Sequence, residues 1–103
     1  MTGNVIQPNG AVSGSNYIET GIIRLDQLSW TLDTGGMYYA TVPNVFPSGK
    51  KAVGGFIYNW YNWPSNFALS YTQSVGNPLN LIIISSTNNF ASEARIAIRI
   101  SIV

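Results

Sequence analysis

Residues 56–64 carry the side chains of this chain that are best suited to binding a sugar. Five of these nine residues are aromatic, two are asparagines and none is charged. An aromatic ring can stack on the C–H face of a sugar, and asparagine amides can hydrogen-bond its hydroxyl groups. We therefore expect ligand contacts toward the end of this stretch, from Asn59, Trp60, Tyr61, Asn62 and Trp63.

Three environments are open to these rings, because aromatic side chains fill cores, subunit contacts and ligand sites alike. On a strand, alternation would place Phe56, Tyr58 and Trp60 on one face, and we expect the Phe56 face to be core. Toward Trp60 the strand nears its end, and Trp63 falls in a loop, where a ring is less fully buried. The sequence alone does not separate ligand binding from packing within the domain or against another subunit.

Two further loops offer polar groups. Asn88 and Asn89 could hydrogen-bond sugar hydroxyl groups, although a bare turn is the plainer role for them. Lys50 and Lys51 follow a Pro-Ser-Gly turn and read as a solvated loop tip, with a weak anion contact as the alternative. We include the two asparagines, but not the lysines, among the expected ligand-binding residues.

Groups for catalysis or metal binding are scarce. The chain has no histidine and no cysteine, which removes the commonest general base and the imidazole and thiolate metal ligands. A glycosidase would need two carboxylates across one bond, and a Ca²⁺ loop would need several at close spacing. The four carboxylates are instead scattered, at Glu19, Asp26, Asp33 and Glu93. We expect no enzymatic activity, no metal and no cofactor.

The length and composition indicate one weakly charged domain. Charged residues make up 9% of the 103 residues, against about 25% in an ordinary soluble domain. The net charge is +1 without a basic cluster, so we expect no nucleic-acid partner. No apolar run approaches the roughly 18 residues of a membrane-spanning helix, so we expect no membrane insertion. Because 46% of the residues are hydrophobic, we expect another subunit to cover part of the surface.

Strand-length segments alternate with turn residues after residue 16. The segment 79–85 is apolar on both faces, which predicts a central strand or one pressed against a partner. The pattern predicts an all-β antiparallel sandwich, jelly roll or barrel of about seven or eight strands over residues 17–103, after a flexible arm or linker at residues 1–16. The expected strands are 17–25, 28–32, 37–42, 52–60, 66–73, 79–85 and a final run in which the isoleucines at 96, 98, 100 and 102 share one face.

Four segments carry a resemblance to a known family. They are Leu-Ser-Trp-Thr-Leu at 28–32, Tyr-Tyr-Ala-Thr-Val-Pro-Asn-Val-Phe-Pro at 38–47, the glycine-containing aromatic strand at 53–60 and the terminal strand. Over residues 21–103 the chain resembles the C-terminal knob or head domain of a bacteriophage tail-fibre or baseplate receptor-binding protein. The resemblance implies a homotrimer at the virion tail tip, joined to upstream tail components, that binds a saccharide of the bacterial cell surface. No binding residue carries over by position.

Other functions remain open from the sequence. One is a structural trimerisation or capsid-decoration domain without a ligand, with the aromatic cluster buried between subunits. Another is a free-standing lectin with a similar sandwich. The third is a polysaccharide hydrolase that would depend on the four scattered carboxylates. The receptor-binding head is the reading we favour, because three weak sugar sites on one trimer would bind with avidity.

Overall fold

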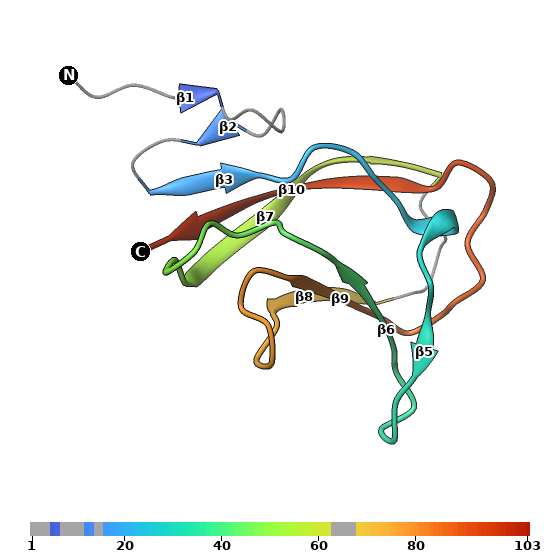
Figure 1. The fold of residues 1–103 in the computed structure, drawn as a ribbon. Coiled ribbons are helices and arrows are strands. Elements are labelled where there is room, and N and C mark those ends of the chain that lie inside the picture. The colour runs from blue at the N-terminus through green and yellow to red at the C-terminus, as the bar shows by residue number, and fades with distance from the viewer. Residues whose placement is uncertain (1–4, 7–11, 14–15, 63–67) are drawn as a thin grey trace.

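The computed structural model describes residues 5–6, 12–13, 16–62 and 68–103 (Figure 1). Two antiparallel sheets face each other, and the short 3-10 turn η1 (Leu25–Gln27) leads from one to the other. The first sheet contains β1 (Val5–Ile6), β2 (Val12–Ser13), β3 (Tyr17–Glu19), β4 (Ile23–Arg24), β7 (Ala52–Tyr61) and β10 (Arg95–Ile102). The second contains β5 (Thr31–Leu32), β6 (Tyr38–Val42), β8 (Leu69–Gln73) and β9 (Leu81–Ser85).

The predicted all-β antiparallel fold is confirmed as a two-sheet sandwich. The described residues from 17 onward contain eight strands, and no helix in the described part of the chain could cross a membrane. Of the predicted arm at residues 1–16, the structure describes β1 and β2, which pair with each other and extend the first sheet beyond β3, together with Asn16. Residues 1–4, 7–11 and 14–15 lie outside the described residues, so the flexible arm stays a prediction.

The last two strands of the chain occupy interior positions in the two sheets. β10 pairs with β3 and β4 on one side and with the whole of β7 on the other. β9 lies between β6 and β8, which confirms the central position that its two apolar faces predicted. Both sheets are therefore held together by the last two strands, β9 and β10. From β3 onward, every other strand except β5 is paired with one of these two.

Two predicted strands differ clearly from their expected extent. The segment 17–25 is divided because Gly21 adopts a φ of 72°, which bends the chain between β3 and β4. The segment 28–32 is strand only at its end, in β5. Its earlier part follows η1 as a loop, in which the Trp30 indole Nε1–H donates a 2.9 Å hydrogen bond to the carbonyl of Leu25. The first break separates two strands of the first sheet, and the second lies where the chain passes from the first sheet to the second.

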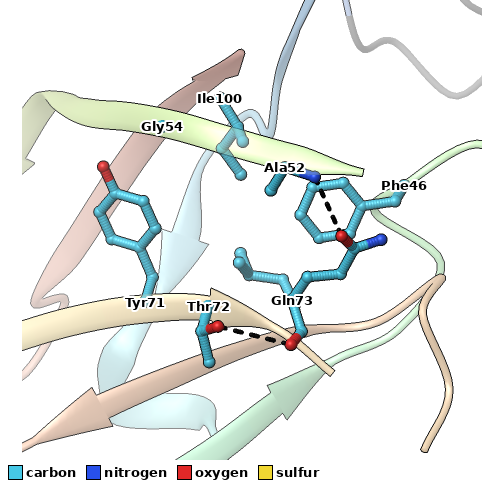
Figure 2. Close-up of a pocket in the computed structure, with 8 residues that line it drawn as sticks. Phe46, Ala52, Gly54, Tyr71, Thr72, Gln73 and Ile100 are labelled. Atoms are coloured by element: carbon cyan, nitrogen blue, oxygen red, sulfur yellow. Dashed lines mark hydrogen bonds between the residues drawn. The ribbon is translucent and has the colours of Figure 1, made fainter. Parts of the chain in front are cut away.

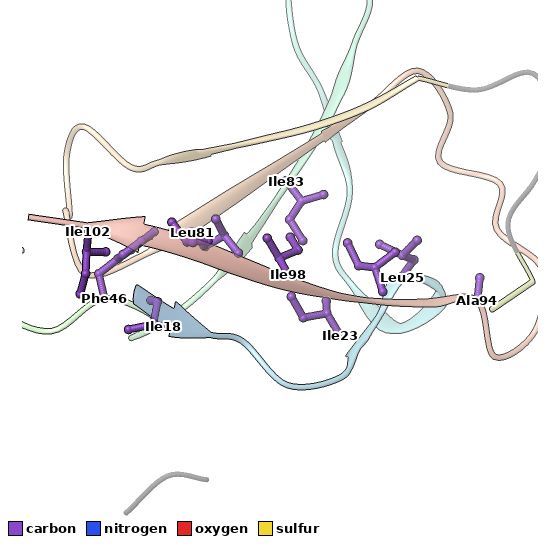
Figure 3. Packing of buried hydrophobic residues seen from close by; sticks show 11 residues of the cluster. Ile18, Ile23, Leu25, Phe46, Leu81, Ile83, Ala94, Ile98 and Ile102 are labelled. Carbon is purple, nitrogen blue, oxygen red and sulfur yellow. The ribbon is translucent and has the colours of Figure 1, made fainter. Parts of the chain in front are cut away.

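The core lies between β10 and β9 (Figure 3). The predicted alternation of the last strand is confirmed, because its four isoleucines are at most 5% exposed: Ile96, Ile98, Ile100 and Ile102. Leu81 and Ile83 of β9 form the facing wall and are 0% exposed. Phe46 lies near Ile102 at one end of this layer, and Leu25 and Ala94 lie toward the other end (Figure 3).

The expectation that the Phe56 face would be core is wrong. Phe56 is 54% and Tyr58 40% exposed, whereas Ile57 packs against the core. The cause is the register of the β7–β10 pair, in which Phe56 lies opposite the outward-facing Arg99 and Ile57 opposite the buried Ile98. Tyr58 is an extra residue, a β-bulge that interrupts simple alternation, so Trp60 lies opposite the buried Ile96 and not on the face of Phe56.

The glycine pair on β7 gives a matched test of its contact with β10. A Cβ atom at Gly55 would lie 2.5 Å from the carbonyl oxygen of Arg99, whereas one at Gly54 would meet nothing within 4 Å. We predict that Gly55→Ala lowers the free energy of unfolding by about 1–3 kcal/mol, because backbone must move to admit the methyl group. Gly54→Ala should change it by less than about 1 kcal/mol. Urea denaturation of the two variants checks this, and equal effects would contradict the close approach.

Candidate functional site

Four aromatic side chains of β7 are exposed, with Phe56 and Tyr61 opposite the outward-facing arginines of β10 and Trp60 opposite Ile96. We call Phe56, Tyr58, Asn59, Trp60 and Tyr61 the β7 surface. Its four rings are 54%, 40%, 60% and 48% exposed in that order. They are exposed because β7 is an edge strand that pairs with β10 and with no other described strand. Charged side chains are absent from β7, so this edge offers stacking faces and one neutral amide.

One end of the β7 surface is held by Arg99. Its guanidinium donates to the Glu19 carboxylate through Nε, at 2.8 Å, and through Nη2. The same group lies 4.8 Å from the ring centroid of Tyr17 and 6.0 Å from that of Phe56. The hydrogen bonds to Glu19 raise the pKa of Arg99, so it stays charged. Partial burial raises the pKa of Tyr58. The negative charge of Glu19 raises this pKa further, and the positive charge of Arg99 lowers it.

The other end of the surface is held by Arg95. Its guanidinium lies 4.6 Å from the ring centroid of Tyr61, which is its partner across the β7–β10 pair. On its other side Arg95 lies opposite Arg24 of β4. Arg24 is itself engaged by Asp26, through Nε to Oδ1 at 2.8 Å and Nη2 to Oδ2 at 2.7 Å. Arginines of β10 therefore lie beside the rings at both ends of the β7 surface, Phe56 and Tyr61.

The loop between β9 and β10 is tied to this surface from two sides. The Asn62 side chain donates from Nδ2 to the carbonyl of Ser92 at 2.8 Å. The backbone N–H of Glu93 donates to Asp26 Oδ2 at 3.0 Å. Asn62 and Glu93 have φ values of 52° and 64°, in the left-handed region where asparagine is the more easily accommodated of the two. Asn62 therefore anchors the loop, and none of the described hydrogen bonds uses its side-chain oxygen.

Some expected ligand residues lie together and others do not. Asn59, Trp60, Tyr61 and Asn62 are consecutive at the end of β7 and are all exposed. Trp63 lies outside the described residues. Two other expected residues, Asn88 and Asn89, are exposed in the β9–β10 loop, and no hydrogen bond of theirs reaches β7.

The arginines were not among the expected site residues. The alternation of the last strand does place Arg95 and Arg99 on one face, which was a usable signal. What alternation does not reveal is that β7 is the neighbour of β10, or that Tyr17 and Glu19 lie across the same sheet. These contacts depend on strand order, which local sequence does not specify.

A small pocket opens beside β7, between the edges of the two sheets (Figure 2). Its volume is about 190 Å³, below the roughly 300–1,000 Å³ of ordinary small-molecule sites. Gln73 spans one end, accepting from the N–H of Ala52 at 3.0 Å and donating to the carbonyl of Lys50 at 2.9 Å. The pocket could admit only part of a ligand. It is lined by Phe46, Ala52, Gly54, Tyr71, Thr72, Gln73, Leu81 and Ile100.

No protein-family model, curated protein or solved structure matches this chain significantly. In the described residues no group of three or more acidic, histidine or cysteine side chains could hold a metal ion. The function is therefore inferred from the geometry of this chain.

Acid should weaken the tie between η1 and the β9–β10 loop. Hydrogen bonds from Arg24, and then from the Glu93 backbone, lower the pKa of Asp26 from 3.8 to about 2. Because the folded-state pKa is the lower one, this stabilisation is present above pH 3.8 and is lost as the pH falls toward 2. We predict that Asp26→Asn lowers stability at neutral pH but reduces its loss between pH 4 and pH 2. Denaturation midpoints at several pH values test this, and parallel curves for wild type and variant would contradict it.

Proposed function

We propose that this domain is a receptor-binding head of a bacteriophage tail that binds a saccharide of the bacterial surface through the β7 surface. The observation that carries the proposal is that four rings of this one edge strand are 40–60% exposed, near the exposed amides of Asn59 and Asn62. These side chains offer stacking faces for sugar rings and neutral groups that hydrogen-bond hydroxyls.

The rigidity of β7 favours this use of its rings. The strand is paired with β10 along its length, and Gly55 lets the two backbones approach closely. Gln73 holds its first residue, Ala52, and Asn62 fixes the chain just after its last. Side chains already ordered before binding lose little conformational entropy when the ligand arrives.

The carboxylates support binding without catalysis. Glu19 is engaged by Arg99, and Asp26 by Arg24 and the Glu93 backbone. Asp33 Oδ1 accepts from two backbone N–H groups of its own turn. A glycosidase mechanism needs two carboxyl groups facing one bond. These three side chains instead hold structure together, which is the role we assign to them.

The distribution of charge supports a homotrimer that leaves β7 free. The strands of the second sheet contain no charged residue, and Ile82 and Ile84 are half-buried on its outer face. The first sheet carries the charges on its strands, namely Glu19, Arg24, Arg95 and Arg99. An uncharged face can meet another copy without burying unpaired charge. We assign the second sheet to subunit contact and the first to the ligand.

A second candidate function is supported by the edge of β7. A ten-residue edge strand without charge or proline is a template for pairing with another chain. In a purely structural trimerisation or capsid-decoration domain, this edge would be the subunit contact and the rings would be buried in the assembly. A free-standing lectin would use the same ligand surface as a single chain.

The first test of the proposal removes individual rings. We predict that Trp60→Ala and Trp63→Ala each weaken binding to bacterial cells by roughly 3- to 10-fold, the range expected for one aromatic contact. Val75→Ala, at a fully exposed side chain in the turn after β8, should bind like the parent. Cell-binding assays on folded variants check this. If both tryptophan variants adsorb as well as the parent, the proposed surface is wrong.

The second test is the mass of the folded protein in solution. We predict a stable species of three times 11.2 kDa by size-exclusion chromatography with light scattering. Ile84→Lys places a charge on the outer face of the second sheet and should shift the mass toward that of one chain. A monomeric wild type would contradict the trimer and favour the free-standing lectin. A trimer unaffected by Ile84→Lys would argue that the contact lies elsewhere, with β7 the first alternative.

A further inference from the structure

Three arginines lie on the outer face of the first sheet, and two of them hold a carboxylate. Arg24 binds Asp26 and Arg99 binds Glu19. Arg95 lies opposite Arg24 across the β4–β10 pair and on the same strand as Arg99, yet no carboxylate in the described part of the chain is within ion-pair distance of it. Its only described partner is the ring of Tyr61.

The side-chain N–H groups of Arg95 are used by none of the described hydrogen bonds. No buried side-chain nitrogen or oxygen in the described residues lacks a partner. The side chain is nevertheless half-buried, and its guanidinium is placed over the Tyr61 ring. A guanidinium that stacks on an aromatic ring can still donate hydrogen bonds through its N–H groups. The spacing of these groups matches the spacing of the oxygens in a carboxylate or phosphate.

The surroundings of Arg95 favour an anion from outside. Arg24, directly opposite on β4, is a second positive charge, and like charges across a strand pair are unfavourable unless an anion offsets them. Asp26 offsets Arg24 and has both oxygens engaged. Glu93 is exposed and acts on Arg24 at longer range. Of the three arginines on this face, Arg95 is the one without an ion-pair partner among the described residues.

We infer that the bound saccharide carries an anionic group, a carboxylate or a phosphate, and that Arg95 binds it while Tyr61 stacks on the neighbouring sugar ring. This inference rests on the proposed function, because Arg95 is assigned to the same end of β7 as Asn59, Trp60 and Asn62. It narrows the ligand class to acidic saccharides such as uronate- or phosphate-containing surface polymers.

The experiment measures adsorption of the protein to bacterial cells that the wild type binds. The cells are used intact, after chemical reduction of carboxyl groups, or after removal of phosphate. The variants are Arg95→Gln, Trp60→Ala, Trp63→Ala and Lys51→Gln. Lys51→Gln is the matched control, because it removes the same charge from an exposed loop at the opposite end of β7. Thermal unfolding confirms that each variant is folded.

We expect Arg95→Gln to weaken binding to intact cells by roughly 10-fold or more, as for a lost charge-assisted hydrogen bond. Lys51→Gln should bind like wild type. One of the two cell treatments should weaken wild-type binding to the level of Arg95→Gln, and which one does so identifies the carboxylate or the phosphate. Titration with inorganic phosphate should also shift the NMR signal of the Arg95 Nε–H group, but not those of Arg24 and Arg99.

Two outcomes would overturn the inference in different ways. If Arg95→Gln binds like Lys51→Gln while Trp60→Ala binds weakly, the saccharide is recognised without an anionic group and the proposed function stands. If Trp60→Ala and Trp63→Ala bind like wild type, the proposed function fails and the assignment of Arg95 fails with it.

Discussion

The structure depends on the two-sided pairing of β10. This strand joins β3 and β4 to β7, and its four isoleucines form one wall of the core at no more than 5% exposure. The same strand aims Arg95 and Arg99 outward, because alternation sends every second side chain to the opposite face. One strand therefore builds the core with one face and positions the flanks of the β7 surface with the other. The site cannot form before the last residues of the chain are in place.

Much of the fold could be predicted from local pattern, and the failures have physical causes. The alternation of Ile96–Ile102 and the two apolar faces of 81–85 correctly indicated strands, a core face and a central position. The predicted face of Phe56 was wrong because the register places this residue opposite Arg99 on the outer face of β10, and the sequence of β7 does not contain that register. Asn59 to Asn62 could be singled out by residue type. The arginine partners could not, since strand order determines which residues lie beside β7.

The two sheets differ in what their outer faces can do. The second sheet is uncharged and suits contact with another copy, whereas the first carries arginines, carboxylates and exposed rings. On the first sheet most of the charges neutralise one another in place, through Arg24 with Asp26 and Arg99 with Glu19. The result is a surface with exposed aromatic groups, neutral amides and one arginine, Arg95, without an ion-pair partner among the described residues. Such a combination suits recognition of a polar ring more than chemistry on it.

The central claim is that the β7 surface stays accessible in the assembled protein and contacts saccharide there. The most direct measurement is the NMR spectrum of the assembled, isotope-labelled protein during addition of polysaccharide purified from cells that it binds. The account predicts that the side-chain N–H signals of Asn59, Trp60 and Asn62 shift, while the backbone signals of Ile82 and Ile84 in the second sheet do not. Unchanged signals from these three side chains in the presence of bound polysaccharide would contradict it.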